Sequence, residues 1–325
     1  MQTLLSKQDR IFVAGHRGMV GSAILRCLKK NGYFSQDNPE NILYVNREQL
    51  NLLDFQDVKK WFRKYKPNVV IIAAAKVGGI IANSKYPYDF LSENLKIQQN
   101  IIENSIEIGV KRLLFLGSSC IYPKYSVQPI VEDELLNGIL EKTNEPYAIA
   151  KIAGIKLCET YHKQYSDNFI SVMPNNLYGP NDNFHPDTSH VIPALIQKFH
   201  NAKVTLSKYV EIWGTGNPLR EFLHVDDLSE AILFIIKNVS VEEIYNRGIS
   251  HINVGSGEEL SIYDLALMIK EVVGFEGEFK FDKSKPDGTP RKLLDTSIMN
   301  KKGWRPKIKL KKGIIDLYAY YKTYF

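Results

Sequence analysis

Cysteine, long apolar runs and excess charge of one sign are all scarce in this 325-residue chain. Its three cysteines, Cys27, Cys120 and Cys158, form an odd set without metal-type spacing, which indicates neither a disulfide framework nor a zinc site. The longest apolar runs, 69–75 and 231–236, are far shorter than the ~20 residues that cross a bilayer. Residues 1–10 lack the apolar core of a signal peptide. We therefore expect no bound metal, no membrane partner and a cytoplasmic location with reduced thiols.

The charge balance is mild, with 42 basic against 36 acidic residues and a formal net charge of +6. Apart from a short lysine cluster at 307–312, the basic residues are scattered, whereas nucleic-acid binders usually carry a concentrated basic stripe. No nucleic-acid partner is therefore expected. A hydrophobic content of 44% is ordinary for a globular protein, and the length suggests two domains.

Strand-like and helix-like segments alternate over the first half of the chain. Short apolar runs predict strands at 10–14, 42–45, 68–75, 112–117 and 169–173. Helical periodicity predicts helices at 19–30, 55–65, 90–108 and from about 146 to about 160. This alternation predicts an α/β fold, a doubly wound parallel sheet of Rossmann type, with ligands along the carboxyl ends of its strands.

The alternation breaks after Pro174. Residues 175–189 are rich in Asn, Pro, Asp and Gly and predict a loop that lines a site. The shorter elements beyond it are predicted helices at 191–200, 226–237 and 262–273 and strands at 210–213 and 251–254. We expect a first domain over 1–173, joined by 219–250, and a smaller α/β domain over 174–218 and 251–325.

A glycine-rich segment follows the first predicted strand and opens the next helix: Gly15-His16-Arg17-Gly18-Met19-Val20-Gly21. Such glycines allow a tight turn and let backbone N–H groups approach a pyrophosphate at the helix N-terminus. The second predicted strand ends in Asn46-Arg47, without the acid that holds the ribose hydroxyls in NAD enzymes. Arg17 and Arg47 instead suit a 2′-phosphate, so the expected cofactor is NADP.

Tyr147 and Lys151 lie four residues apart in the predicted helix that begins near Pro146, so both side chains share one helix face. A nearby ammonium favours phenolate over phenol and is expected to lower the pKa of the tyrosine. Beside a hydride source, this pair would exchange a proton with an alcohol or ketone.

Further segments complete a pattern that spans nearly the whole chain: Ala73-Ala74-Ala75-Lys76-Val77-Gly78-Gly79-Ile80, Leu116-Gly117-Ser118-Ser119-Cys120-Ile121-Tyr122-Pro123-Lys124, Asn176-Leu177-Tyr178-Gly179-Pro180, His190-Val191-Ile192-Pro193-Ala194, Arg220-Glu221-Phe222-Leu223-His224-Val225-Asp226-Asp227 and Lys285-Pro286-Asp287-Gly288-Thr289-Pro290-Arg291-Lys292. With the glycine loop and the Tyr147 helix, they resemble the GDP-L-fucose synthases of the extended short-chain dehydrogenase/reductase superfamily. Against that family, residues 33–41 look like a small insertion.

The resemblance implies a fold, a reaction and a set of residues. Ser118 would complete a Ser-Tyr-Lys set with Tyr147 and Lys151 for reduction at C4 of the sugar, with Cys120 as base and His190 as acid for epimerisation at C3 and C5. Cofactor contacts are implied for Gly15, Arg17, Gly18, Met19, Val20, Gly21, Arg47, Leu116, Gly117, Lys151, Pro174, Asn175, Asn176, Leu177 and His190. Substrate contacts are implied for Ser118, Ser119, Cys120, Lys198, Trp213, Arg220 and Asp287.

The implied activity is NADPH-dependent 3,5-epimerisation and 4-reduction of GDP-4-keto-6-deoxy-D-mannose to GDP-L-fucose by a homodimer. The first domain would bind NADP and the second the GDP-sugar. An alternative is C4 reduction alone, on an already epimerised GDP-4-keto-6-deoxy sugar such as a heptose. A 4,6-dehydratase is disfavoured because Ser119 and Cys120, not an acid, follow Ser118. A non-enzymatic NADP sensor is disfavoured because Ser118, Tyr147 and Lys151 are all present.

Overall fold

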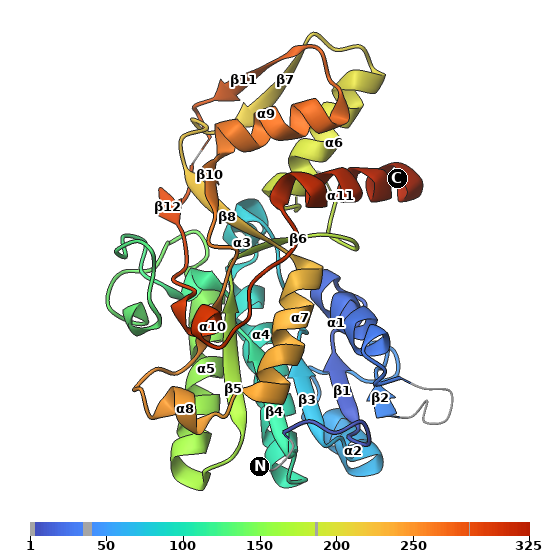
Figure 1. The fold of residues 1–325 in the computed structure, drawn as a ribbon, viewed down its shortest axis with the longest axis vertical. Coiled ribbons are helices and arrows are strands. Elements are labelled where there is room, and N and C mark those ends of the chain that lie inside the picture. Colours follow the sequence, from blue (N-terminus) through green and yellow to red (C-terminus); the bar gives the residue numbers. More distant parts are fainter. Residues whose placement is uncertain (1–3, 35–40, 186–187, 286) are drawn as a thin grey trace.

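The computed structural model describes residues 4–34, 41–185, 188–285 and 287–325, so positions 35–40 of the small insertion lie outside the described residues. A six-stranded parallel sheet with the order β2-β1-β3-β4-β5-β9 forms the larger part (Figure 1). Its strands are β1 (Ile11–Ala14), β2 (Ile42–Leu43), β3 (Val69–Ile72), β4 (Arg112–Leu116), β5 (Phe169–Pro174) and β9 (Ile252–Val254). The doubly wound sheet predicted from the alternation is confirmed.

Both faces of this sheet are buried, which explains why its strands are continuous apolar runs. Val69 and Ile71 of β3 pack into one hydrophobic cluster, and Val70 and Ile72 pack into another on the opposite face. Successive side chains of a strand point to opposite faces, so one run of four apolar residues supplies both cores.

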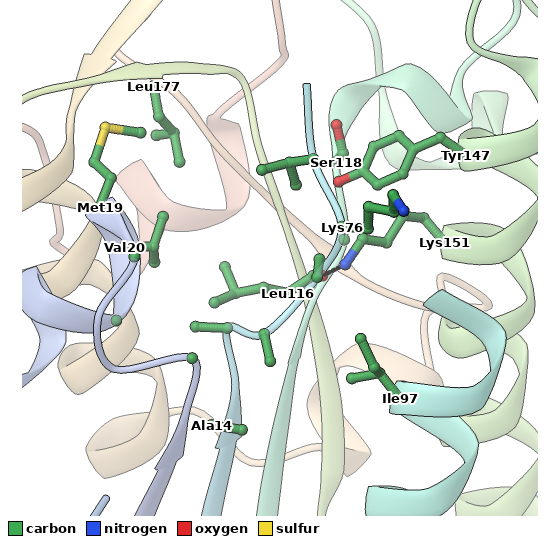
Figure 2. A pocket seen from close by; sticks show the side chains of 18 of the residues that line it. Ala14, Met19, Val20, Lys76, Ile97, Leu116, Ser118, Tyr147, Lys151 and Leu177 are labelled. Carbon is green, nitrogen blue, oxygen red and sulfur yellow. Dashed lines mark hydrogen bonds between the residues drawn. The ribbon is translucent and has the colours of Figure 1, made fainter. Parts of the chain in front are cut away.

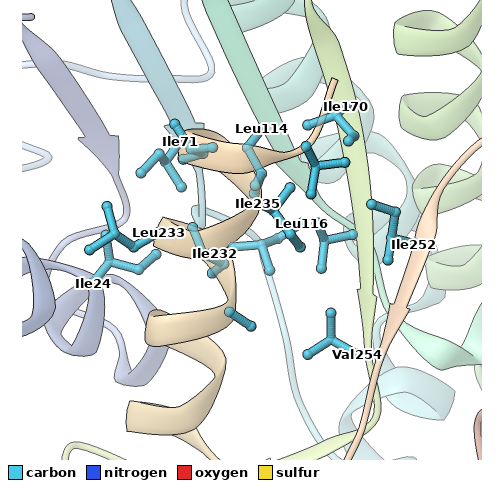
Figure 3. Packing of buried hydrophobic residues seen from close by; sticks show 14 of the residues in the cluster. Ile24, Ile71, Leu114, Leu116, Ile170, Ile232, Leu233, Ile235, Ile252 and Val254 are labelled. Carbon is cyan, nitrogen blue, oxygen red and sulfur yellow. The ribbon is translucent and has the colours of Figure 1, made fainter. Parts of the chain in front are cut away.

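Helices cover the two faces. On one face, α1 (Met19–Lys30) and α7 (Val225–Asn238) contribute Ile24, Ile232 and Ile235 to the cluster drawn in Figure 3. On the other face, α2 (Phe55–Tyr65), α4 (Pro87–Glu107) and α5 (Glu145–Tyr165) contribute Phe62, Ile101 and Ile155. Short helices α3 (Ile80–Lys85), α8 (Glu242–Tyr245) and α10 (Ser297–Lys301) fill the connections.

The smaller part lies beyond the carboxyl ends of the parallel strands, at the top of Figure 1. There β8 (Leu219–His224) pairs with β6 (Asn176–Tyr178), β10 (Glu259–Ser261) and β12 (Arg291–Lys292), and β7 (Tyr209–Trp213) pairs with β11 (Glu278–Asp282). A separate hydrophobic cluster joins α6 (Val191–Val204), α9 (Ile262–Val273) and α11 (Leu310–Tyr324).

The sheets divide the chain differently from the domain boundaries expected above. Strand β9, expected in the smaller domain, pairs with β5 in the large sheet, and β8, expected in the larger domain, belongs to the smaller sheet. Strands β8 and β9 each pair with partners distant in sequence, and the chain passes between the two parts from β5 to β6 and again from β9 to β10. The chain therefore crosses between the two parts several times, beside the carboxyl ends of the parallel strands.

Candidate active site

A cavity of about 700 Å³ opens along the carboxyl ends of β1, β3, β4 and β5. The chain passes from β1 to β2 on one side and returns to β3 on the other, and such a switch point is where open α/β sheets bind ligands. The cavity is large enough to hold part of a dinucleotide and a sugar together. Every residue expected to contact the cofactor, and all five expected catalytic residues, line it.

The glycine loop forms one end of the cavity. Gly15 has a φ of +86°, and a Cβ atom on it would lie 2.6 Å from the main-chain nitrogen of Ala74, so only glycine fits beside β3. Helix α1 starts after Gly18 with no side-chain cap and no acid in its first turn. Its first N–H groups therefore face the cavity without a protein acceptor, which suits the phosphate groups of a dinucleotide.

Arg17 and Arg47 both line this end and are both exposed. The neighbouring ring of His16 packs against Tyr44, with 5.1 Å between the ring centroids, and burial holds the pKa of His16 below its usual value. The imidazole of His16 is therefore neutral, and the positive charge here comes from the guanidinium groups of Arg17 and Arg47. This charge agrees with the binding of a 2′-phosphate.

Tyr147, Lys151 and Ser118 form the other end, where α5 passes the end of β4 (Figure 2). The ammonium of Lys151 donates to the carbonyl of Leu116 at 2.8 Å and lies 5.8 Å from the centroid of the Tyr147 ring. Burial lowers the pKa of Lys151 from 10.5 to about 8.

The expected lowering of the tyrosine pKa by Lys151 is wrong for this structure. Burial raises the pKa of Tyr147 well above its usual value, the charge of Cys120 adds to that, and only a hydrogen bond with Ser118 opposes it. The phenol therefore stays protonated at neutral pH, which is the form that donates a proton.

Cys120 lies on the short 3₁₀ turn after β4, and only 7% of its surface is exposed. Burial raises the pKa of its thiol, while the positive charge of Lys292, the hydroxyl of Ser118 and the charge of Lys151 lower it. Because burial prevails, the electropositive surroundings expected for this cysteine only partly favour its thiolate.

His190 is the N-cap residue of α6 (Val191–Val204), and its side chain lines the same cavity. The protein atoms around the ring lower its pKa, and no acid contributes an opposing effect. The imidazole is therefore neutral at pH 7 before a ligand binds.

The four substrate contacts expected in the second domain do not line the cavity but form two clusters in the smaller part. Asp287 accepts hydrogen bonds from the main chain and side chain of Thr215, and Arg220 donates to the main-chain oxygen of Asp287 at 3.3 Å. Two ammonium groups lie near the Trp213 ring, that of Lys198 at 5.2 Å from the ring centroid and that of Lys285 at 5.7 Å. Arg220 pairs in register with Lys292, which does line the cavity.

A buried chain of hydrogen bonds joins the active-site turn to the smaller sheet. The hydroxyl of Ser119 donates to Asn175, whose amide donates to the carboxylate of Glu221 on β8. Glu221 is fully buried and also accepts from the main-chain N–H groups of Gly257 and Leu294. The two parts are therefore held in register at the point where β12 brings in Lys292.

Sequence reasoning assigned no role to several polar residues that line the cavity, among them Lys76, Asn83, Glu93, Asn144 and Lys292. Lys76 and Lys292 stand inside the family-like segments and Asn144 directly precedes α5, but nothing in their spacing singles them out. Asn83 and Glu93 lie beyond those segments and reach the cavity only through the path of α3 and α4.

The lysine cluster at 307–312 does not form a free basic patch. Four of its lysines each pair with an acid, as shown by Lys307–Glu230, Lys309–Glu258, Lys311–Glu271 and Lys312–Asp316. Across 4–34, 41–185, 188–285 and 287–325, no helix combines the length and the apolar character needed to span a bilayer.

A glycine loop on a doubly wound sheet, leading to a tyrosine–lysine pair under a second domain, defines a dehydrogenase/epimerase of the extended short-chain class. In agreement, residues 11–255 match the NAD dependent epimerase/dehydratase family. The chain is also 53% identical to GDP-L-fucose synthase 1 of Arabidopsis thaliana over 99% of this chain and 95% of that protein. It belongs to the family of GDP-L-fucose synthases.

Two solved structures extend the comparison. A GDP-6-OMe-4-keto-L-xylo-heptose reductase from Campylobacter jejuni superposes with a TM-score of 0.92 at 38% identity, covering 98% of this chain and 99% of that one. A GDP-L-fucose synthetase from Naegleria fowleri bound to NADP gives a TM-score of 0.86 at 27% identity, covering 98% and 95%.

Proposed function

We propose that this chain converts GDP-4-keto-6-deoxy-D-mannose to GDP-L-fucose with NADPH, as both a 3,5-epimerase and a 4-reductase. The observation that carries the proposal is that Cys120 and His190 share one cavity with Ser118, Tyr147 and Lys151. A reductase alone needs only the last three residues. The first two supply the additional proton transfers that epimerisation requires.

In the reduction, NADPH bound over the glycine loop supplies the hydride that reaches C4 of the sugar. Tyr147 gives its phenolic proton to the oxygen at C4, while Ser118 holds that oxygen with a second hydrogen bond. Lys151 would stabilise the phenolate that remains and would help to hold the nicotinamide ribose. Its bond to Leu116 already directs the ammonium to the cavity side of β4.

In the epimerisation, the C4 ketone makes the hydrogens at C3 and C5 acidic. Cys120 removes a proton from one face, and His190 returns one from the other, since the two residues come from opposite parts of the molecule. The developing enolate carries negative charge, which favours a protonated His190. The positive charge of Lys292 favours the thiolate of Cys120 and offsets that enolate.

The nucleotide end of the substrate would occupy the smaller part. Arg220 suits the diphosphate, since a guanidinium forms paired hydrogen bonds with phosphate oxygens, and Lys198 adds a second charge. Trp213 and Asp287 would contact the guanosine. The two functional units then divide along the cavity, with the six-stranded sheet binding NADP and the two smaller sheets binding the GDP-sugar.

The same proposal includes a homodimer that acts in the cytoplasm, where thiols remain reduced. Helices α4 and α5 pack side by side, and α5 leaves Ile149 and Leu157, eight residues apart on one face, 44% and 38% exposed. A second copy packed on this face would bury both. Sedimentation should show a dimer that the double variant Ile149→Asp, Leu157→Asp converts to a monomer.

The test of the activity is product analysis by NMR after incubation with GDP-4-keto-6-deoxy-D-mannose and NADPH. In D₂O without NADPH, the bifunctional enzyme introduces deuterium at C3 and C5 of the keto-sugar. A C4 reductase acting on an already epimerised sugar, such as a heptose, introduces none there. Absence of NADPH oxidation with the keto-sugar contradicts the proposal as a whole.

A further inference from the structure

Asn83 braces a turn on the cavity wall, and nothing in the proposed reaction uses it. Its side chain is 5% exposed and lines the cavity from α3. The amide nitrogen donates to the main-chain oxygens of Gly78 at 2.7 Å and Gly79 at 3.1 Å. These bonds fix the turn through which the chain leaves β3 and enters α3.

The turn at Gly78–Gly79 contacts the backbone of residues 188–189, which directly precede His190. The N–H group of Gly79 donates to the carbonyl of Thr188 at 3.3 Å. A Cβ atom on Gly79 would lie 3.1 Å from the carbonyl oxygen of Ser189, so the two backbones are in close contact. The conformation of the turn therefore sets where the backbone at 188–189 lies, and with it the start of α6 at His190.

The hydrogen bonding of Asn83 indicates that its donors matter more than its packing. The side-chain oxygen is buried and has no hydrogen-bond partner, which costs about 1–3 kcal/mol in a protein interior. A leucine of similar size would avoid this cost but would leave the turn without its two side-chain hydrogen bonds. Asparagine at this position leaves its side-chain oxygen unpaired, while its amide nitrogen holds the carbonyl groups of Gly78 and Gly79.

We propose that Asn83 is a positioning residue for His190, acting through the Gly78–Gly79 turn and the backbone at 188–189. This inference rests on the proposed role of His190 in epimerisation. Misplacement of a reacting group by about 1 Å costs on the order of 10²-fold in rate. Loss of the brace therefore slows proton transfer at C3 and C5 and leaves transfer at C4 intact, because Ser118, Tyr147 and Lys151 stand on other elements.

The experiment compares two reactions in one variant. Asn83→Leu removes two hydrogen bonds together with the unpaired oxygen, effects of similar size and opposite sign, so thermal unfolding should show a protein about as stable as the wild type. Deuterium incorporation from D₂O into GDP-4-keto-6-deoxy-D-mannose should fall by ~10- to 100-fold. Oxidation of GDP-L-fucose by NADP⁺, which needs only transfer at C4, should stay within about twofold of wild type in kcat and KM.

Two controls sharpen the result. Asn104 on α4 is also buried and donates to the main-chain oxygen of Asn100 at 2.8 Å, and it does not line the cavity. Asn104→Leu should leave the ratio of the two reactions unchanged. In a His190→Gln background, Asn83→Leu should cause no further loss of deuterium incorporation, because both changes act through one group.

Equal losses in both reactions, or unchanged deuterium incorporation in Asn83→Leu, would overturn the positioning role while leaving the proposed function in place. A further loss in the His190→Gln background would also overturn it. If the wild-type protein oxidises GDP-L-fucose but incorporates no deuterium, the epimerase part of the proposed function fails, and the role of Asn83 fails with it.

Discussion

The ammonium of Lys151 is bound to the carbonyl oxygen of Leu116 at 2.8 Å, not to the hydroxyl of Tyr147 four residues before it. This bond ties α5 to the end of β4 and keeps a buried cation at the cavity wall, since only 4% of the lysine is exposed. The buried charge of Lys151 is available to a ligand in the cavity, and its burial lowers the stability of the folded protein.

Replacement of this cation should stabilise the fold and abolish reduction. Burial places the folded-state pKa of Lys151 at about 8, below the unfolded value of 10.5, so the charge destabilises the folded state at pH 7. Lys151→Met should raise the free energy of unfolding by ~1–2 kcal/mol at pH 7, after allowance for the lost bond to Leu116. Urea unfolding measures this.

The pH dependence supplies the check on that explanation. The destabilisation is fully present below pH 8 and disappears as the pH rises from 8 to 10.5, because the folded protein loses its proton first. The advantage of Lys151→Met over the wild type should therefore shrink across this range. An advantage that stays constant from pH 7 to pH 10 would show that packing, and not charge, is responsible.

Tyr147→Phe should separate the two half-reactions. The change removes the proton donor but keeps the ring and its edge-on contact with Phe90, whose centroid lies 6.2 Å away. NADPH oxidation with the keto-sugar should fall by ~10²- to 10⁴-fold, while deuterium incorporation at C3 and C5 persists. Because burial raises the pKa of the phenol, the wild-type reduction rate should show no loss from tyrosine ionisation up to pH 9.

Local signals located the helices well and the cavity residues only in part. The limits of α1, α2 and α9 follow from amphipathic periodicity together with end signals such as Asp54, Ser261 and Gly274, each of which acts within a few residues. Strand β8 carries no such signal. It is a strand because β6, β10 and β12 pair with it from 40 to 70 residues away.

The same distinction explains the site. Gly15, Tyr147 and Lys151 belong to local motifs, so their roles can be inferred from the sequence alone. Lys292 reaches Cys120 only because β12 aligns with β8, and that register depends on Glu221 accepting bonds from strands and turns far apart in the chain. Pairing between strands that are far apart in the chain produces no periodic pattern in the sequence. The sequence alone therefore does not indicate a role for Lys292.

The choice of NADPH over NADH should depend on Arg17 and Arg47. Both are exposed at the cavity end beyond β2, and among the described residues no acid lines the cavity at this end. Charge-assisted bonds to a 2′-phosphate are worth about 1.5–3 kcal/mol, so each alanine variant should lower the kcat/KM preference for NADPH by ~10-fold or more. Arg63→Ala, which breaks only a pair with Glu107 on the surface, should leave the preference unchanged.

Lys292 should control the reactivity of Cys120. Its charge is the largest influence that favours the thiolate, so Lys292→Met should raise the pKa of the thiol further and slow its alkylation by iodoacetamide at pH 8 by ~10-fold. Mass spectrometry identifies the labelled cysteine, and Cys120→Ser removes that label. Lys285→Met, which changes a cation beside Trp213, should leave the alkylation rate as it is. If Lys292→Met and Lys285→Met slow alkylation equally, the rate depends on the overall positive charge of the smaller part. Lys292 then has no specific influence on the thiol of Cys120.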